Sequence, residues 1–371
     1  MKRKALILSV GYGEGHHAAA YAMREELEHR DWQCRVEDVC KMASPTLFLW
    51  TQMFYQFCVR RMPWLWGVAY AQTGTADWGK LLHYPVISQV FACLKRLLAE
   101  EQPDVVFCTY PLFGYMLDAY NECASKVQPY VLIVTDSLEI SRPWLQTMAP
   151  IVCVPDELSR QLVCERYGLS EEKVIAAGFP VKRAFVPAQD ISQPSMDDFR
   201  IVYGAYAETR RVCDDIRAIL QYVPGARITL LAGRRKKHLE KVLASELQSN
   251  RLLILERTEE MPRLFAQNHL YIGKAGAATM FEAYASSIPV VVNYALPGQE
   301  QGNRQLLLDD RAGMAVESTT ELLAVLLGLI DGEAESWHRL RSAMQQKNRV
   351  GGAARIADNV EMCFYHDTVD R

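Results

Sequence analysis

The sequence lacks the features that define several large classes of protein. No run in its 371 residues reaches the roughly 18 consecutive apolar residues that a membrane-spanning helix needs. Its ten cysteines form no C-x-x-C pair, which favours reduced thiols in a cytoplasmic protein over a disulfide framework or a zinc site. A net charge of −3 gives no general attraction to nucleic acid or anionic lipid.

The composition is that of a folded protein large enough for two domains. Half of the residues are hydrophobic and 23% are charged, which excludes a disordered chain. Two series of short apolar runs alternate with helical segments, and a polar stretch without periodicity separates them. This pattern predicts an α/β fold with two doubly wound, Rossmann-like domains that face each other across a cleft. The expected boundaries are a first domain at 1–185, a linker at 186–198 and a second domain at 199–350.

A glycine turn and two histidines follow the first apolar run. Ala5–Val10 is typical of a strand buried in a parallel sheet rather than of a signal peptide, and glycines up to Gly15 lead into a helix. Such a turn also begins dinucleotide sites, and Asp38 after the next possible strand keeps that alternative open. Histidine suits proton abstraction, and a helix N-terminus favours its neutral form. His16 and His17 are therefore candidate bases, or simply polar residues that start a helix.

A carboxylate ends a later apolar run of the first domain. Tyr130–Thr135 reads as a parallel strand, and Asp136 comes directly after it. In an open α/β sheet, the carboxyl ends of the strands form the ligand-binding edge. Asp136 is therefore predicted to orient His16 or to hold a hydroxyl group of a substrate.

The densest set of candidate ligand groups lies in Ile272–Asn303. A short apolar run, a glycine turn and a helical pattern from Gly276 predict an anion site, because the helix dipole places roughly half a positive charge there. Glu282, one turn into the helix, could hold the two hydroxyls of a ribose. A polar loop adds Gln299, Glu300 and Asn303. We interpret the stretch as a nucleotide-sugar pocket; an ordinary α/β repeat with a solvated loop is the alternative.

The stretch Ser44–Arg96 differs from the rest of the chain. It holds four of the seven tryptophans and five basic residues against one acid. Tryptophan with nearby cations is typical of a segment that lies on a membrane surface, whereas a core helix with aromatic packing is the alternative. The residues expected to contact a membrane or lipid acceptor are Trp50, Arg60, Arg61, Trp64 and Trp66.

Two motif blocks resemble one family of glycosyltransferases. The family's K-A-G-x-x-T-x-x-E-A and P-G-Q-E-x-G-N patterns match Lys274–Ala283 and Pro297–Asn303, and its G-x-G-H-x-x-[SA]-A turn resembles Gly13–Ala20. The family includes monogalactosyldiacylglycerol synthase and the bacterial processive diacylglycerol glucosyltransferases. The peptidoglycan N-acetylglucosaminyltransferase is a more distant relative.

The resemblance implies the two-domain arrangement called GT-B and an inverting transfer of glucose or galactose from a UDP-sugar to a lipid hydroxyl such as that of diacylglycerol. It makes His16 the base and places Arg234 near the diphosphate. It also implies that the final segment, 351–371, is a helix crossing back to the first domain. The implied donor-binding residues are Gly15, Arg234, Lys274, Gly276, Ala277, Thr279, Glu282, Gln299, Glu300 and Asn303.

The expected partners are a UDP-sugar as donor substrate, a lipid acceptor and a membrane surface, with no nucleic acid. Because the sequence has no D-x-D carboxylate pair, we expect no metal ion on the diphosphate and no other cofactor. The expected location is cytoplasmic, with peripheral attachment to the inner face of the cell membrane.

The chain departs from the family pattern at two places. Ile140 stands where relatives have a histidine, and the loop Gly204–Thr209 has one glycine where relatives have several. These departures leave two alternatives open: a UDP-sugar epimerase of the same architecture and a UDP-sugar sensor without catalytic activity.

Overall fold

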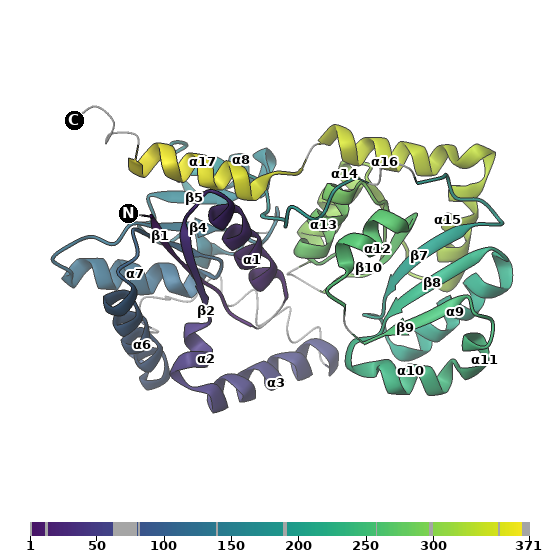
Figure 1. Cartoon of the computed structure of the whole chain (residues 1–371), viewed down its shortest axis with the longest axis horizontal. Coiled ribbons are helices and arrows are strands. Elements are labelled where there is room, and N and C mark those ends of the chain that lie inside the picture. The colour runs from purple at the N-terminus through teal and green to yellow at the C-terminus, as the bar shows by residue number, and fades with distance from the viewer. Residues whose placement is uncertain are drawn as a thin grey trace. The chain divides into compact units, whose positions relative to one another are not determined.

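The chain folds into two compact units. One is built from Met1–Arg183, Pro297–Gly302 and Val350–Arg371, and the other from Ala184–Leu296 with Asn303–Arg349 (Figure 1). The computed structural model describes residues 2–11, 14–61, 80, 82–138, 140–187, 191–256, 258–296, 300–347 and 349–365.

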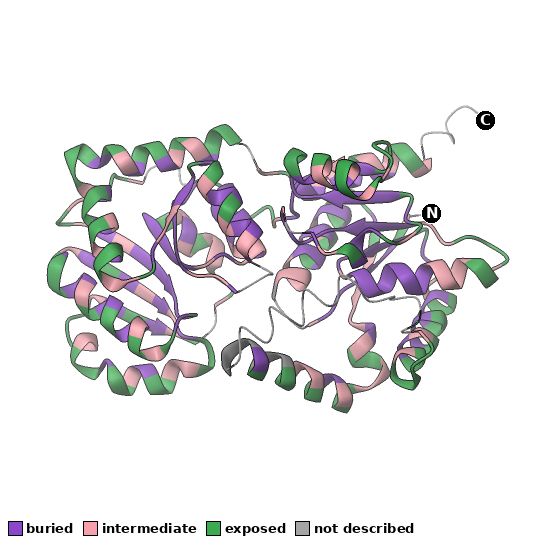
Figure 2. Ribbon diagram, turned by 180° about the vertical axis from the view of Figure 1, so that it is seen from behind, coloured by how far each residue is buried: buried purple, intermediate pink, exposed green. Residues whose placement is uncertain are grey.

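The first unit is organised by a six-stranded parallel sheet in the order β2-β1-β3-β4-β5-β6. Its central strands are short and rich in β-branched and aromatic residues, and every residue of β3, β4 and β5 is buried because helices cover both faces (Figure 2). The strands are β1 (Lys4–Leu8), β2 (Gln33–Glu37), β3 (Val105–Cys108), β4 (Tyr130–Ile133), β5 (Ile151–Val154) and β6 (Val174–Ala176).

Helices of the first unit follow its strands and begin with recognisable caps. Proline is the first residue of three of them, where its missing N–H costs nothing, and Asp156 caps another by accepting from the backbone N–H of Ser159. The helices are α1 (Glu14–His29), α2 (Val39–Ala43), α3 (Pro45–Arg61), α6 (Pro85–Glu101), α7 (Pro111–Cys123) and α8 (Glu157–Tyr167).

The last helix, α17 (Gly352–Tyr365), belongs to the first unit and packs against α1 (Figure 1). Arg30 at the end of α1 forms ion pairs with Asp358 at 2.6 Å and Glu361 at 3.3 Å. The helix starts very close to the turn after β6: a Cβ added to Gly352 would lie 2.3 Å from the carbonyl oxygen of Phe179. Only glycine fits there.

The second unit has its own six-stranded parallel sheet, in the order β12-β11-β10-β7-β8-β9. Its central strand β7 pairs with β8 on one side and β10 on the other, and the core cluster packs on its buried residues. The strands are β7 (Phe199–Gly204), β8 (Ala226–Leu231), β9 (Leu252–Leu255), β10 (Leu270–Lys274), β11 (Val290–Tyr294) and β12 (Gly313–Ala315).

The helices of the second unit complete its α/β alternation. The most strongly amphipathic among them, α9, buries Val212, Ile216 and Ile219 at helical spacing. The set comprises α9 (Thr209–Tyr222), α10 (Lys236–Val242), α11 (Ala244–Leu247), α12 (Met261–Gln267), α13 (Ala277–Ser286), α14 (Gln301–Asp309), α15 (Thr319–Ile330) and α16 (Glu335–Lys347).

A buried carboxylate ties α13 to the end of the second unit. Asp310 is 5% exposed and accepts a hydrogen bond from the Tyr284 hydroxyl at 2.8 Å. The Arg349 guanidinium donates to both of its oxygens, at 2.5 and 3.0 Å, and Lys347 lies at 3.1 Å. These cations keep the pKa of Asp310 below its ordinary value although burial opposes them.

Both sheets confirm the predicted class of two doubly wound, Rossmann-like domains. In each, the chain runs outward from one strand and then restarts on the other side of it. The order reverses between β1 and β3 in the first unit and between β7 and β10 in the second. Ligands of open α/β sheets bind at the carboxyl ends of the strands at such a reversal, so each unit presents one expected binding edge.

Candidate active site

The imidazole of His16 lies at the binding edge of the first unit. It projects from the first turn of α1, directly after β1, and its Nδ1 is 3.0 Å from the Thr135 hydroxyl at the end of β4. The Tyr110 ring, which follows β3, meets it edge-on at 5.2 Å between centroids. Trp144 lies 6.4 Å away. Segments far apart in the sequence therefore converge on one histidine.

His16 is held in its neutral form. Burial is the main cause that lowers its pKa to about 4, and the neighbouring His17 contributes in the same direction. A hydrogen bond to the backbone of Thr109 acts against both, because it favours the protonated ring. At neutral pH the imidazole is therefore uncharged, which is the state in which it can accept a proton.

Asp136 contacts Trp144, which in turn lies beside His16. Its side chain is buried, and its Oδ2 accepts a hydrogen bond from the indole Nε1 of Trp144 at 2.9 Å. Trp144, which ends a short 3-10 turn, is 1% exposed and lies beside the His16 ring. The sequence singled out Asp136 but missed Thr135, the adjacent residue whose hydroxyl lies at His16. The same argument from a strand end would have found both.

Ile140, the position where the resemblance implied a histidine, is a core residue here. It is 6% exposed and packs in one cluster with Trp144 and Leu145. The side chain at this position therefore contributes apolar packing beside Trp144. It does not interrupt the hydrogen bond between Trp144 and Asp136.

A second set of contacts fixes the backbone at Gly11, just before the described part of α1. Its N–H donates to Asp38 Oδ2 at 2.9 Å, and its carbonyl accepts from the Gln52 amide of α3 at 2.6 Å. Asp38 also caps α2 by accepting from the backbone N–H of Lys41 at 2.9 Å. Its carboxylate thus serves the loop and the helix cap, rather than the ribose contact that a dinucleotide site would require.

The binding edge of the second unit carries the glycine turn predicted as an anion site. Gly276 is the N-cap of α13 with an extended backbone, and as a glycine it offers no side chain to cap the helix. Asn303 donates from its amide to the carbonyl oxygen of Ala275 at 3.0 Å. Its Oδ1 is buried and has no hydrogen-bond partner among the residues that the structure describes. An acceptor held in this way is available to a ligand N–H or hydroxyl group.

The remaining donor-site candidates lie on several different elements. Lys274 ends β10, and its Nζ lies 5.2 Å from the centre of the Tyr206 ring. Ala277, Thr279 and Glu282 lie on α13 and are partly exposed, Glu300 is buried, and Arg234 is exposed after β8. Gly15 lies in α1 of the first unit. Gln299 is outside the described residues.

The aromatic stretch forms a helix that turns its apolar side outward. In α3, Phe48 and Cys58 are buried, whereas Trp50 is 68% exposed. More than half of each of five large apolar side chains on this helix is exposed: Leu49, Trp50, Met53, Phe54 and Phe57. The side chains of Arg60 and Arg61, and residues Trp64 and Trp66, lie outside the described part. No helix among the described residues is long and apolar enough to cross a membrane.

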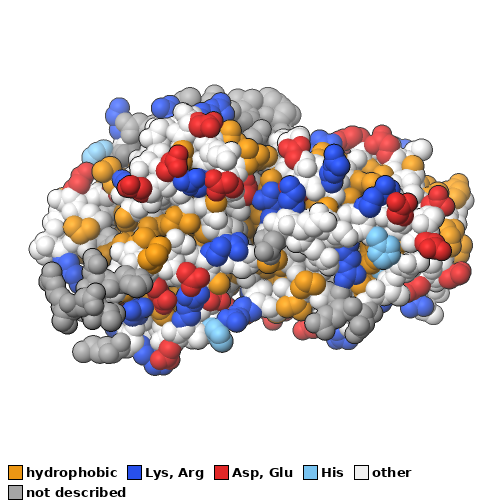
Figure 3. Space-filling model, turned by 90° about the horizontal axis from the view of Figure 1, so that it is seen from above, with side chains coloured by type: hydrophobic (Ala, Val, Ile, Leu, Met, Phe, Trp, Pro, Cys, Tyr) orange, Lys and Arg blue, Asp and Glu red, His pale blue; other side chains and the backbone are white. Residues whose placement is uncertain are grey.

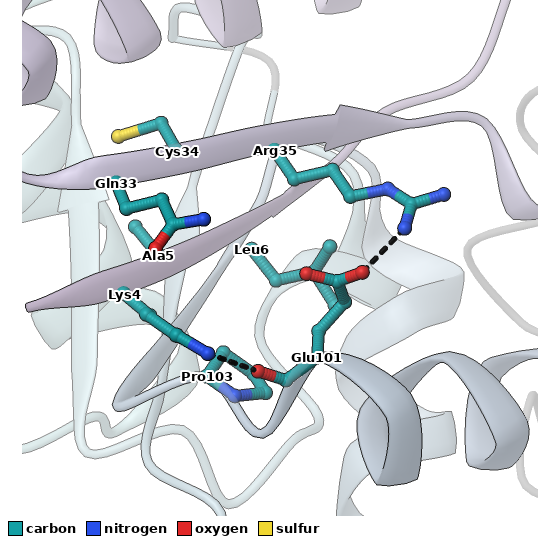
Figure 4. Close-up of a pocket in the computed structure, with 8 residues that line it drawn as sticks. All are labelled: Lys4, Ala5, Leu6, Gln33, Cys34, Arg35, Glu101 and Pro103. Atoms are coloured by element: carbon teal, nitrogen blue, oxygen red, sulfur yellow. Dashed lines mark hydrogen bonds and ion pairs between the residues drawn. The ribbon is translucent and has the colours of Figure 1, made fainter.

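The rest of the described surface shows fewer features that indicate a binding site. On the face shown in Figure 3, acidic and basic side chains are interspersed, in agreement with the small net charge. A pocket of about 190 Å³ opens at the amino ends of β1 and β2, where Arg35 forms an ion pair with Glu101 (Figure 4). Burial raises the pKa of its Cys34 thiol to about 12, so the thiol is unreactive at neutral pH. The pocket lies at the opposite end of the sheet from His16.

The fold is that of GT-B glycosyltransferases and of epimerases built on the same plan. The crystal structure of Acinetobacter baumannii MurG superposes with a TM-score of 0.60 at 13% identity, covering 97% of this chain and 99% of that one. The UDP-GlcNAc 2-epimerase of Neisseria meningitidis superposes with a TM-score of 0.61 at 13% identity, covering 98% and 100%.

Sequence comparison identifies the relatives more specifically. Residues 16–181 match the family model of monogalactosyldiacylglycerol (MGDG) synthase. Monogalactosyldiacylglycerol synthase 2 of Arabidopsis thaliana is 25% identical over 87% of this chain and 73% of its own length. The processive diacylglycerol beta-glucosyltransferase of Bacillus subtilis is 21% identical over 96% and 94%. The resemblance predicted from the motifs is confirmed, and the chain is related to these glycosyltransferases.

Proposed function

We propose that the protein is an inverting glycosyltransferase that moves glucose or galactose from a UDP-sugar to the hydroxyl of a membrane lipid such as diacylglycerol. The observation that carries this proposal is the neutral, enclosed imidazole of His16 at the binding edge of the first unit. A neutral base at that edge matches the needs of a hydroxyl acceptor. The relatives named above agree with the proposal: one is called a monogalactosyldiacylglycerol synthase and the other a processive diacylglycerol beta-glucosyltransferase.

In the proposed reaction, the acceptor oxygen attacks the anomeric carbon from the face opposite the diphosphate. The bond between that carbon and the diphosphate oxygen breaks, and UDP leaves with the electron pair. His16 takes the hydroxyl proton. The Thr135 hydroxyl and the Tyr110 ring hold the imidazole in place. The Thr109 backbone favours the imidazolium as it forms, because its hydrogen bond raises the pKa of the ring.

The negative charge on the departing UDP is proposed to form at α13. The N-cap of this helix is a glycine, which cannot cap the first-turn N–H groups with a side chain, and Lys274 supplies a cation two residues before Gly276. Preorganised donors of this kind are worth roughly 3–4 kcal/mol apiece. The buried Oδ1 of Asn303 and the carboxylates of Glu282 and Glu300 are proposed to hold hydroxyl groups of the sugars.

The acceptor is proposed to reach the enzyme from a membrane surface that α3 touches, at the inner face of the cell membrane. Fully burying one large apolar side chain is worth about 1.5–3 kcal/mol. Trp50, Met53 and Phe54 are 61–68% exposed in water, so partial insertion of this helix side gives several kcal/mol. Polar Gln52 points the other way, to the Gly11 carbonyl. This orientation favours peripheral binding.

The decisive assay supplies UDP-glucose or UDP-galactose together with diacylglycerol vesicles and measures both UDP and glycolipid. We expect UDP and glycolipid in equal amounts, and a large loss of both in His16→Gln. Release of UDP without glycolipid defeats the transferase proposal. A changed UDP-sugar without UDP release indicates an epimerase, and binding without any turnover indicates a sensor.

Membrane binding has a matched test in vesicle co-sedimentation. The double variant Trp50→Ser, Phe54→Ser should lose most of its binding, because both side chains are 68% exposed on the same helix. The control replaces two exposed leucines elsewhere, Leu158 and Leu253, with serine. Equal co-sedimentation of the two double variants contradicts the proposed surface.

A further inference from the structure

We propose that Tyr206 is a positioning residue of the donor site: its ring holds the Lys274 ammonium where the diphosphate of the UDP-sugar binds. The inference rests on the proposed function, since it concerns the same nucleotide-sugar site. It gives a role to the loop after β7, which from the sequence looked like a glycine-rich loop that had lost its glycines.

The loop is built to fold the tyrosine ring back over the strand end. The backbone N–H of Tyr206 donates to the carbonyl of Gly204 at 2.9 Å, which closes a tight three-residue turn. Ala205 between them is buried, and its N–H donates to Leu231 of β8 at 3.0 Å. The turn is thus fixed by backbone hydrogen bonds on both sides.

The single glycine of the loop is the one that the ring requires. A Cβ added to Gly204 would lie 2.7 Å from Cε2 of Tyr206 and 2.8 Å from the hydroxyl oxygen of Tyr271. Any other residue would therefore push the Tyr206 ring away from its place. Glycine at this position therefore leaves room for the Tyr206 ring. The ring alone already requires it, whether or not the backbone also comes close to a ligand.

Tyr206 and Lys274 meet where the strand order of the second unit reverses. Tyr206 follows β7, Lys274 ends β10, and these two strands pair directly, with Ile272 opposite Tyr203. The Lys274 Nζ lies 5.2 Å from the centre of the Tyr206 ring, within cation–π range. Gly276, the N-cap of α13, is two residues further along the chain.

This contact helps to fix the direction of the Lys274 side chain. A lysine side chain has many rotamers, and a ring that attracts its ammonium selects those that keep the charge near the start of α13. Tyr206 is 47% exposed, so solvent reaches part of its surface. A diphosphate at α13 then pairs with an ammonium that the ring already keeps in place. The ring therefore affects the affinity for phosphate groups, not the affinity for the nucleoside.

The test compares the binding of UDP and uridine by titration calorimetry. Tyr206→Leu removes the ring but keeps an apolar side chain, whereas Tyr206→Phe keeps the ring. We expect Tyr206→Leu to weaken UDP about two- to fivefold, the range of an exposed cation–π contact, and to leave uridine unchanged. Tyr206→Phe should bind UDP like the wild type. Tyr222→Leu, at another tyrosine of this unit that is 55% exposed, is the control.

A double-mutant cycle ties the effect to the cation. Lys274→Met should weaken UDP binding, and adding Tyr206→Leu to it should produce no further loss, because the ring acts through the ammonium. In turnover, Tyr206→Leu should raise the KM for the donor and leave kcat nearly unchanged.

The possible failures are distinguishable. Equal UDP affinity in the wild type and Tyr206→Leu overturns the inference alone, and so does a loss that is equally large for uridine, which means that the ring stacks on the base. Additive losses in the double variant also overturn it. If the wild-type protein binds no UDP, the proposed function fails and the inference fails with it.

Discussion

The low pKa of His16 predicts that catalysis persists in mildly acidic solution. Burial lowers this pKa to about 4, so the proposed base stays neutral well below the ordinary histidine value of about 6.5. At pH 5 the imidazole is then about nine-tenths neutral, whereas an unperturbed histidine is only about 3% neutral. Between pH 8 and pH 5, kcat/KM should fall less than about twofold, against about thirtyfold for an ordinary histidine.

A variant that lets water reach the ring provides the matched perturbation. Tyr110 meets His16 edge-on at 5.2 Å, and Tyr110→Ala opens space on that side of the imidazole. Because burial is the largest cause of the low pKa, hydration should move it towards 6.5 and raise the acid limb of the pH profile by about one unit. An acid limb near pH 6.5 in the wild type, or no shift in Tyr110→Ala, refutes the reasoning.

The assay needs a control for unfolding. Burial also lowers the pKa of His269 to about 4. The folded state binds fewer protons than the unfolded state between pH 6.5 and 4, so the free energy of unfolding falls as the pH drops through this range. At pH 5 the loss is about 2 kcal/mol for each histidine. Urea unfolding at pH 5 and 7 should show this decrease. Rates enter the pH profile only at pH values where circular dichroism shows that the enzyme is folded.

Three substitutions test the packing around the sites. Arg349→Met leaves the buried Asp310 without its main cation and should lower the free energy of unfolding in urea by about 3 kcal/mol; a change below 1 kcal/mol contradicts this. Gln52→Leu removes the donor to the Gly11 carbonyl and should lower kcat severalfold without changing vesicle binding, so unchanged kcat argues against a role in placing His16. Gly352→Ala should loosen α17 and make it sensitive to proteolysis, since the added Cβ would meet a carbonyl oxygen at 2.3 Å; wild-type resistance contradicts this.

The fold was predictable because a strand that is buried on both faces has an apolar residue at nearly every position. Runs such as Val105–Cys108 and Ile151–Val154 are apolar throughout because helices cover both sides of the sheet. Two series of such runs are enough to predict two parallel sheets. The strand orders, by contrast, depend on which strand each new strand pairs with, and the sequence of a single strand does not show its partner.

The site was predictable only where chemistry and local sequence coincide. His16 and Gly276 each follow a strand and a glycine, so local pattern identifies them. Thr135 could have been named by the strand-end argument that named Asp136, but its contact with His16 could not, because it joins residues 119 positions apart that follow two strands, β1 and β4, which are not neighbours in the sheet. Tyr206 was missed because the direction of its ring depends on space beside Gly204, which only the structure shows.

The fold by itself does not separate a transferase from an epimerase, because MurG and the Neisseria epimerase superpose on this chain almost equally well. We expect α3 in the first unit to make this separation. A helix that serves only the core turns apolar residues inward, but this one directs Gln52 inward and exposes Trp50 and Phe54. An epimerase, whose substrate is soluble, has no need of such a surface. An enzyme that takes its acceptor from a bilayer does, and the Gln52 contact joins that surface to the Gly11 backbone ahead of the proposed base.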